Sequence, residues 1–496
     1  MSRLTIRLKA LRLSRTKSSG ILAALVTGLG IVSGDALSTN RLRDFVDVAC
    51  SRSDCLEAFG QADAHHYLAM GLAIRDGTIG DHQLDWAMAM WSVGMGLAYA
   101  AALAVEPIVP VIVGVAALSF ITWGCAWWSV LSSFPRSRQR VVCAVGLIVL
   151  TMLPQFRDGL FSWLLVFADS LALGFSVLAA SVFVEANVQL RAFGRRFQRT
   201  SEEIVWRYCV PGGLVASAIY VRPIAEVPFL LVGALAGLVS AVNIAKYLRG
   251  KNPRKVYWSA GSRRLWVSLA VATTIAIVFT VPWRLYAHER INGGWSMRAS
   301  SDAIWTNAWV TSEFLGPEGS WAWDAGYGGW CRSYPTKCEV FSSRESSVPR
   351  ELRYTGFGAV SIVEYRDAAI ETARDDPMPI VVDRIAHWWS AWTQPSIEAA
   401  EPWLGLPLAI ALLALCVLNI LIIAIGVARN RLFFLSAYLA LLVGAQVPLL
   451  VSHVEERYLY TACVTIALTT VVLVSAGAFA EAIRHIRHFV PSSRVQ

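Results

Sequence analysis

The sequence predicts an all-α polytopic membrane protein with about 10 to 11 transmembrane helices, on the strength of three observations. Of its 496 residues, 55% are apolar and only 16% are charged, whereas soluble domains are near one quarter charged. Apolar runs of about 20 residues, the length that crosses the hydrocarbon core, recur along the chain. The arginines and lysines behind the net charge of +9 occur in short clusters between these runs, which is how membrane topology is set. We therefore expect a membrane environment and no nucleic-acid partner.

The candidate spans follow one another from the N-terminus. They are 20–34, 86–104, 107–131, 141–155, 160–187, 205–221, 223–247, 264–283, 402–427, 432–449 and 458–480. The first follows a basic N-terminus that resembles a signal peptide, but no small-residue cleavage pattern is clear after it. We expect an uncleaved first helix with a cytoplasmic N-terminus, in a multi-pass protein of the cytoplasmic (inner) membrane.

The loops between the spans are of two kinds. Basic loops, which the positive-inside rule places in the cytoplasm, are 136–140, 191–199, 246–264, 429–431 and the tail around 484–487. The other loops, expected outside, are 35–85, 154–158, 222–223, 284–401 and 452–458. This alternation holds only if 86–131 crosses the membrane once, and we expect 86–104 to be the piece that does not cross. The alternative has two ordinary spans there, with Arg136 to Arg140 outside.

Residues 284–401 are too long for a simple loop and contain nine tryptophans. We expect a small mixed extracytoplasmic domain, whose tryptophans either stack on sugar rings or form a small core and an interfacial belt. This divides the chain into an N-terminal transmembrane catalytic module, 1–283, with its first outer loop at 35–85, the tryptophan-rich domain 284–401, and C-terminal transmembrane helices, 402–496.

Four cysteines fall in the segments expected outside: Cys50, Cys55, Cys331 and Cys338. Two close pairs are compatible with disulfides in an oxidising compartment such as a periplasm. Free thiols remain an alternative, and metal binding is less favoured because neither pair has a two-residue spacing.

Acids, histidines and cations from distant parts of the chain are all expected on the outer face. They are Asp63, His65, His66, Tyr67, Asp158, Asp169, Arg222, Arg284, His453, Glu455, Glu456, Arg457 and Tyr458. Ionisable residues near membrane depth are costly and usually face a protein interior or a water-filled cavity. Their convergence predicts a functional site on this face.

Each of these residues also has a purely structural interpretation. Asp63 begins a surface helix, where it could be an N-cap. Asp169 lies in an apolar run and could form a structural ion pair. Arg222 could grip a phosphate bidentately or simply extend to the interface. The run Glu456-Arg457-Tyr458 could be an interfacial ion pair with an aromatic-belt residue.

In their order and sidedness, these motifs resemble the GT-C superfamily of glycosyltransferases that use polyprenyl-phosphate sugars, which includes protein mannosyltransferases and the lipid A aminoarabinose transferase. The resemblance rests on Asp63 and Tyr67 after the first span, Pro154 and Asp169, Arg222-Pro223, Pro282-Trp283-Arg284 and Arg457-Tyr458. The chain departs from the family in lacking paired acids in the first loop, where Ala64 follows Asp63. It also has Thr461 where a proline often follows the late Arg-Tyr.

The resemblance implies an inverting hexosyl- or pentosyltransferase acting on the periplasmic side, in polysaccharide or glycan biosynthesis of the cell envelope. Asp63 would be the catalytic carboxylate and Asp169 the second acid. The donor phosphate would be held by Arg222, Arg457 and Arg284. The residues that would position donor or acceptor are His66, Tyr67, Glu456, Tyr458 and His453. The partners would be a polyprenyl-phosphate-sugar donor and a lipid-linked or glycan acceptor, and a divalent cation, magnesium or manganese, is left open as a cofactor.

Two other classes of membrane protein are compatible with buried charges among spans. An O-antigen polymerase or ligase also has a large outer loop and outer arginines, but it needs no acid in its first loop. A secondary transporter or flippase commonly shows two related halves, which this sequence does not. The sequence contains no P-loop, GxSxG, HExxH or dinucleotide-binding motif, which argues against ATP-driven transport and the familiar hydrolases.

Overall fold

The computed structural model describes residues 17–30, 62–78, 93–106, 111–153, 168–189, 200–222, 225–248, 260–287, 405–428, 436–451 and 456–489, with eight more positions between 374 and 392. Within these ranges every regular element is a helix, as the all-α prediction requires. Each predicted span overlaps at least one of these helices.

Residues 17–30 form the first described helix. The others are α4 (Ala62–Asp76), α6 (Val93–Leu103), α7 (Val111–Ser132), α8 (Ser137–Met152), α10 (Ala168–Val184), η5 (Glu185–Gln189), α12 (Thr200–Ile204), η6 (Val205–Cys209), α13 (Val210–Val221), α14 (Glu226–Leu248), α15 (Ala260–Ala287), α21 (Gly405–Ala428), α22 (Ser436–Gly444), α23 (Val447–Val451), α24 (Glu456–Ala476) and α25 (Ala478–Phe489).

Among the described residues, five stretches are long and apolar enough to cross a membrane: Val113–Ser132, Ala168–Asn187, Trp266–Tyr286, Leu406–Ala424 and Leu459–Ala476. Two shorter apolar helices, Val93–Leu103 and Pro228–Val242, accompany them. The protein is therefore a multi-pass membrane protein, and the full number of about 10 to 11 spans stays a prediction.

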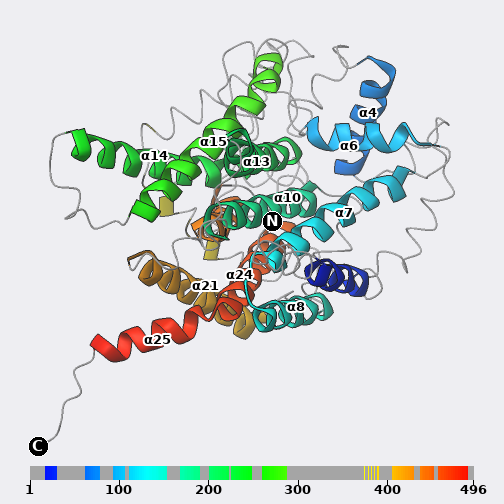
Figure 1. Ribbon diagram of the computed structural model, residues 1–496. Coiled ribbons are helices and arrows are strands. Elements are labelled where there is room, and N and C mark those ends of the chain that lie inside the picture. Colours follow the sequence, from blue (N-terminus) through cyan, green and yellow to red (C-terminus); the bar gives the residue numbers. More distant parts are fainter. Residues whose placement is uncertain are drawn as a thin grey trace, which may run out of the picture.

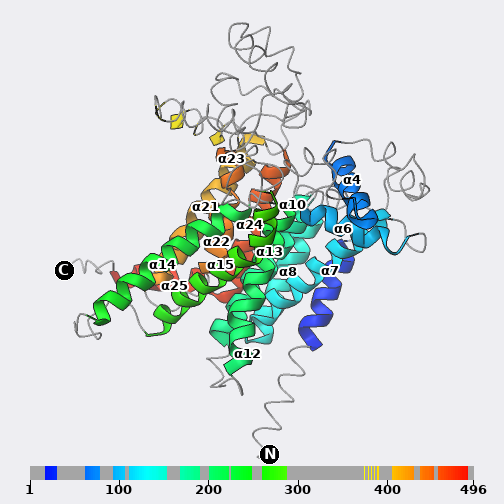
Figure 2. The ribbon, with the colours of Figure 1, turned by 90° about the horizontal axis from the view of Figure 1, so that it is seen from above.

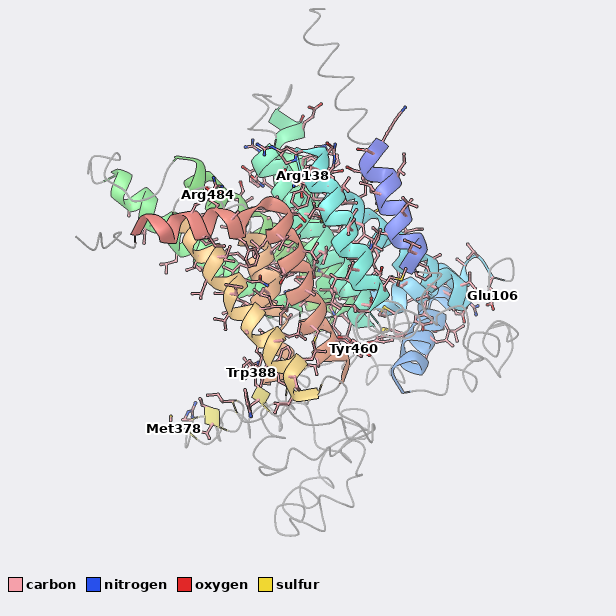
Figure 3. All side chains as sticks on the ribbon, turned by 90° about the horizontal axis from the view of Figure 1, so that it is seen from below. Glu106, Arg138, Met378, Trp388, Tyr460 and Arg484 are labelled. Carbon is pink, nitrogen blue, oxygen red and sulfur yellow. The ribbon has the colours of Figure 1, made fainter. Side chains whose placement is uncertain are left out.

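The long helices run side by side and give the bundle two ends (Figure 1; Figure 2). We call them the α4 end, where α4, α6 and α23 lie, and the α12 end, where α12 lies (Figure 2). Figure 3 shows Tyr460 and Trp388 toward the α4 end, and Arg138 and Arg484 toward the α12 end.

Helix α6 lies across the α4 end and does not traverse the bundle. At its start, a Cβ added to Gly94 would stand 2.5 Å from the carbonyl carbon of Tyr220, at the end of α13. At its other end, Ala102 packs against Gly114 in the first turn of α7. Both contacts are at the same end of the bundle, and an 11-residue helix is only about 16 Å long. The described part of this apolar piece, Val93–Leu103, thus lies at one end of the bundle, and the expectation that 86–104 does not cross the membrane stays a prediction.

Helix α10 packs against α7, α13, α22 and α24 at the centre of the bundle. The indole of Trp123 in α7 donates a 3.2 Å hydrogen bond to Ser170 Oγ in α10, and its ring also packs on Trp127. These contacts fix the start of α10, which carries Asp169, relative to α7.

A buried polar contact joins α21 to α24. The Asn419 amide donates to Thr470 Oγ1 at 2.9 Å and to the carbonyl of Ile466 at 3.2 Å, and Asn419 is fully buried. Surrounding residues of the main apolar cluster, such as Cys416 and Ile423 of α21 and Cys463 of α24, keep water from this contact.

Candidate functional site

A buried apolar cluster at the α4 end joins helices that are distant in sequence. It contains Tyr67 and Leu68 from α4, Met95, Tyr99, Ala102 and Leu103 from α6, Val111, Val115 and Ala116 from α7, Ala168, Leu171 and Ala172 from α10, and Val221 from α13. Ala168 and Val221 are the chain neighbours of Asp169 and Arg222. The cluster therefore holds α4, which begins one residue before Asp63, against the part of the bundle that carries these two charges.

Helices α4 and α6 meet at glycines. A Cβ on Gly71 would lie 2.7 Å from the Cβ of Tyr99, and one on Gly96 would lie 2.9 Å from Met70 Sδ. Small residues at a crossing let two backbones approach closely, as is common between helices in membranes. This close packing gives α4 a defined position on the bundle.

Asp169 and Arg222 form an ion pair at the α4 end. Arg222 Nε lies 3.1 Å from Asp169 Oδ1, and the two side chains are 15% and 11% exposed, in the order Arg222 and Asp169. Asp169 is in the first turn of α10, and Arg222 follows the last residue of α13. A helix N-terminus favours a carboxylate and a helix C-terminus favours a cation, so both ends stabilise the pair. Of the interpretations open from the sequence, the structure supports an ion pair for Asp169.

A second ion pair lies deeper at the same end. Arg284 Nη2, in the last turn of α15, donates to Glu226 Oε1 in the first turn of α14, and Arg284 Nε donates to Thr280 Oγ1 at 2.8 Å. The two charged side chains are only 8% and 3% exposed. Among the residues that the structure describes, the buried Arg284 Nη1 has no hydrogen-bond partner.

One short turn links the two pairs. Arg222 and Glu226 stand on either side of the α13–α14 connection, where the Ala225 N–H donates to the Arg222 carbonyl at 3.0 Å. The Tyr220 hydroxyl donates to the Phe279 carbonyl at 2.8 Å and so joins α13 to α15. Asp169, Arg222, Glu226 and Arg284 therefore form one alternating set of acids and cations.

The sequence analysis missed Glu226. Its signal was an acid at the start of an apolar run, four residues after Arg222, a position where a charge at membrane depth needs a partner.

For several predicted site residues, the structure describes the position of the backbone only. Asp63 and His66 lie in the first turns of α4, and Glu456, Arg457 and Tyr458 open α24, but the side chains of all five lie outside the described part of the structure. Tyr67, one helical turn after Asp63, is buried in the cluster at the α4 end. Asp63 and Tyr67 share a helix face at this spacing.

Other predictions fall outside the described residues altogether. These are His453, Asp158, the cysteines Cys50, Cys55, Cys331 and Cys338, and all of 288–401 except eight positions. The two disulfides and the mixed fold of the outer domain stay predictions.

Tryptophans near the end of 284–401 contact the helix bundle. The Trp388 indole donates a 3.0 Å hydrogen bond to Gln446 Oε1, between α22 and α23, and Trp392 is 2% exposed within the main apolar cluster. Trp388 lies at the α4 end (Figure 3). This part of the tryptophan-rich region is thus attached at the end that carries the ion pairs. No sequence pattern pointed to Gln446.

A metal site is not evident among the described residues, where no group of three or more His, Cys, Asp or Glu side chains lies close enough to hold an ion. Asp169 and Glu226, the described acids of the two pairs, are each engaged by an arginine. Because each carboxylate is paired with a guanidinium, Asp169 and Glu226 do not fit a metal site in the arrangement observed.

Comparison with known proteins gave two structural similarities. No family model and no curated protein matches the chain. Two solved structures of the oligosaccharyltransferase of Archaeoglobus fulgidus are similar to it: AglB in complex with an inhibitory peptide and a dolichol-phosphate, and the apo form. The matches cover 98% and 96% of this chain, at 14% and 12% identity, both with a TM-score of 0.46. In each case the match covers 52% of the oligosaccharyltransferase chain, so this chain spans about half of its length.

Proposed function

We propose that this protein is a membrane glycosyltransferase that moves a sugar from a polyprenyl-phosphate-linked donor to a lipid, glycan or protein acceptor on the extracytoplasmic face. The observation that carries the proposal is the gathering of Asp169, Arg222, Glu226 and Arg284 at one end of a transmembrane bundle, beside α4, whose second residue is Asp63. Transfer of a lipid-linked sugar phosphate needs a base, a phosphate clamp and access from the membrane, and this end offers residues for the first two.

Asp63 serves as the general base in this proposal. The acceptor hydroxyl attacks the anomeric carbon of the donor, the bond from that carbon to the phosphate oxygen breaks, and the hydroxyl proton passes to the Asp63 carboxylate. The products are the inverted glycoside and polyprenyl phosphate. A phosphate leaves well without protonation, so no second acid is required. The position of Asp63 in the first turn of α4 favours its ionised, basic form.

Arg222, Arg284 and Arg457 hold the donor phosphate and stabilise the charge that develops on it. A guanidinium has five N–H donors in a fixed fork and suits bidentate phosphate binding. Arg284 is oriented by Glu226 and Thr280, and its Nη1, buried and without a partner among the described residues, is the donor it offers to a phosphate oxygen. Asp169 acts as a positioning residue that orients Arg222.

The remaining predicted site residues position the substrates. His66 belongs to α4 at this end, and Glu456 and Tyr458 belong to the first turn of α24. Tyr67, which is buried, acts by holding α4 in place, and His453 lies outside the described residues. The tryptophan-rich region closes over the acceptor and excludes water that would hydrolyse the donor. Its attachment through Trp388 to Gln446 supports this location.

The distribution of charge supports the sidedness that we propose for the reaction. Arg136 and Arg138, at the start of α8, are exposed at the α12 end, and basic loops favour the cytoplasm. We therefore assign the α12 end and the N-terminus to the cytoplasm and the α4 end to the outside, in the inner membrane of a cell with a periplasm.

The test is sugar transfer by the purified, reconstituted chain from labelled polyprenyl-phosphate sugars to a lipid and glycan extract of the source cell. Asp63→Asn removes the base and keeps the size of the side chain, so we expect transfer to fall by about 10²–10⁴-fold. The matched control is Asp76→Asn at the other end of α4, where the exposed carboxylate accepts a 2.7 Å hydrogen bond from Arg75 Nε. We expect that variant to keep wild-type activity.

Two outcomes would count against the proposal. Equal transfer by wild type and Asp63→Asn would remove Asp63 from the mechanism. An absence of transfer by the wild type from every donor would favour the polymerase, ligase or transport classes.

A further inference from the structure

The chain changes direction at a glycine between its last two described helices. Helix α24 ends at Ala476, and Gly477 adopts a φ of 75°, in the left-handed region that glycine reaches without strain. The Gly477 N–H still donates to the Val474 carbonyl at 3.0 Å, and the Glu481 N–H donates to the Gly477 carbonyl at 3.2 Å. Helix α25 then leaves the bundle sideways at the α12 end, across the direction of α24 (Figure 1; Figure 3).

Helix α25 is strongly amphipathic by sequence register. Its apolar face consists of Phe479, Ala482, Ile483, Ile486 and Phe489, at the spacing of one helical stripe. Its polar face consists of Glu481, Arg484, His485, Arg487 and His488. The apolar face is rich in aromatic and branched residues and the polar face in basic ones, which is the composition of a helix that lies on a membrane surface.

The bundle covers only the beginning of the apolar face. Ala478 and Ala482 are buried where α25 contacts α21 and α24. Ile483, the next residue on the same face, is 51% exposed, and Arg484 is exposed beside it. The buried Ala478 and Ala482 determine the rotation of the helix about its axis. At this rotation Ile483 lies beyond the edge of the bundle.

We propose that α25 lies in the plane of the membrane surface at the α12 end, with Ile483 among the acyl chains and Arg484 and Arg487 on the headgroups of anionic phospholipids. The inference stands apart from sugar transfer and holds for any function of the chain.

Charge and position favour a lipid surface over a soluble protein as the occupant. Helix α25 follows directly after Gly477 from α24, which contains one of the five apolar stretches of spanning length, and Arg484 of α25 lies toward the α12 end (Figure 3). The exposed Ile483 is therefore close to the place where a spanning helix reaches the membrane surface. Its basic residues complement an anionic leaflet, which attracts basic segments near its surface. Because α25 continues α24, a membrane-bound α25 would also hold the depth of α24, whose first turn carries Glu456, Arg457 and Tyr458.

Hydrogen exchange of the full-length chain, measured by mass spectrometry in lipid nanodiscs, tests this proposal. The nanodiscs contain either phosphatidylcholine alone or phosphatidylcholine with phosphatidylglycerol. We expect the amides of Ala478–Phe489 to exchange at least roughly tenfold more slowly when the anionic lipid is present, because two basic residues attract the helix to that lipid. The double variant Arg484→Glu and Arg487→Glu should lose this difference.

The matched control reverses the charge of two other arginines at the α12 end. Arg136→Glu with Arg138→Glu, at the exposed start of α8, should leave the lipid dependence of α25 in place. The amides of α24 report folding and should exchange equally in all the variants. If α25 of the wild type exchanges at the same rate in both lipids, the proposal is wrong. It is also wrong if both double variants abolish the difference, or if protection appears only when a soluble protein fraction is added.

Discussion

The buried ion pairs of the α4 end and the exposed basic residues of the α12 end differ in their contact with solvent. At the α4 end, Asp169, Arg222, Glu226 and Arg284 are mostly withdrawn from solvent and joined in ion pairs. At the α12 end, Arg136, Arg138 and Arg484 are exposed. Burying charge is costly even when it is paired, whereas exposed basic residues at a membrane surface cost little. The exposed charges of the α12 end are thus explained by membrane orientation alone, whereas the buried charges of the α4 end call for a functional explanation. Among the described residues there are exceptions at both ends: Arg140, one turn into α8, is buried, and Arg75 and Asp76, in the last turn of α4, form an exposed pair.

We expect the largest effect from a mutation that breaks the ion pair between Glu226 and Arg284. Glu226→Gln leaves the Arg284 guanidinium buried without a carboxylate, so we expect the free energy of unfolding to fall by about 3–5 kcal/mol. Thermal unfolding of the purified protein in detergent measures the change. Transfer activity should fall too, because Glu226 orients a proposed phosphate ligand.

The double variant Glu226→Leu with Arg284→Leu separates stability from function. Apolar residues in place of a buried pair are often neutral or stabilising, so we expect an unfolding midpoint near that of wild type and a loss of transfer. If the double variant is as unstable as Glu226→Gln, the pair is not the cause of the instability. If it is stable and active, Arg284 does not bind the phosphate.

A smaller effect is expected where α6 meets α13. Gly94→Ala would place its Cβ 2.5 Å from backbone atoms of Tyr220, which cannot yield as a flexible side chain does. We expect a loss of about 1–3 kcal/mol and reduced transfer, because α4 is held on the bundle through α6. The control is Gly237→Ala in α14, where a Cβ would meet nothing within 4 Å. Equal loss of stability in both variants would contradict the close contact.

The smallest effect is expected at the α12 end. Arg138→Gln removes an exposed charge that no described contact requires, so we expect a change in stability within about 0.5 kcal/mol and unchanged transfer. The same unfolding and transfer measurements apply. A loss comparable to that of Glu226→Gln would remove the contrast between the two ends.

The sequence predicted the helices well, because hydropathy and span length are local properties. The alternation of basic loops also led us to expect one crossing fewer in 86–131, with 86–104 not crossing; its described part, Val93–Leu103, lies at one end of the bundle. That argument needs only charge and order along the chain.

Which acid pairs with which arginine could not be derived from the sequence. Arg222 and Asp169 were both identified, yet their partnership depends on α10 and α13 meeting in space. Glu226 and Arg284 are separated by a whole helical hairpin, and neither residue carries a sequence signal for the other. The hydrogen bond from Trp388 to Gln446 was missed for the same reason.

The contact of Asn419 with Thr470 has a consequence for the rotation of α21. Helix α21 contains the most hydrophobic of the five spanning stretches, with a mean hydropathy of 2.9, and a helix that is apolar all round can pack at many rotational settings. An amide facing lipid would lose its hydrogen bonds, so every setting that turns Asn419 away from α24 is disfavoured. One polar side chain thereby selects a single rotational register for the helix that returns the chain from the tryptophan-rich region to the membrane.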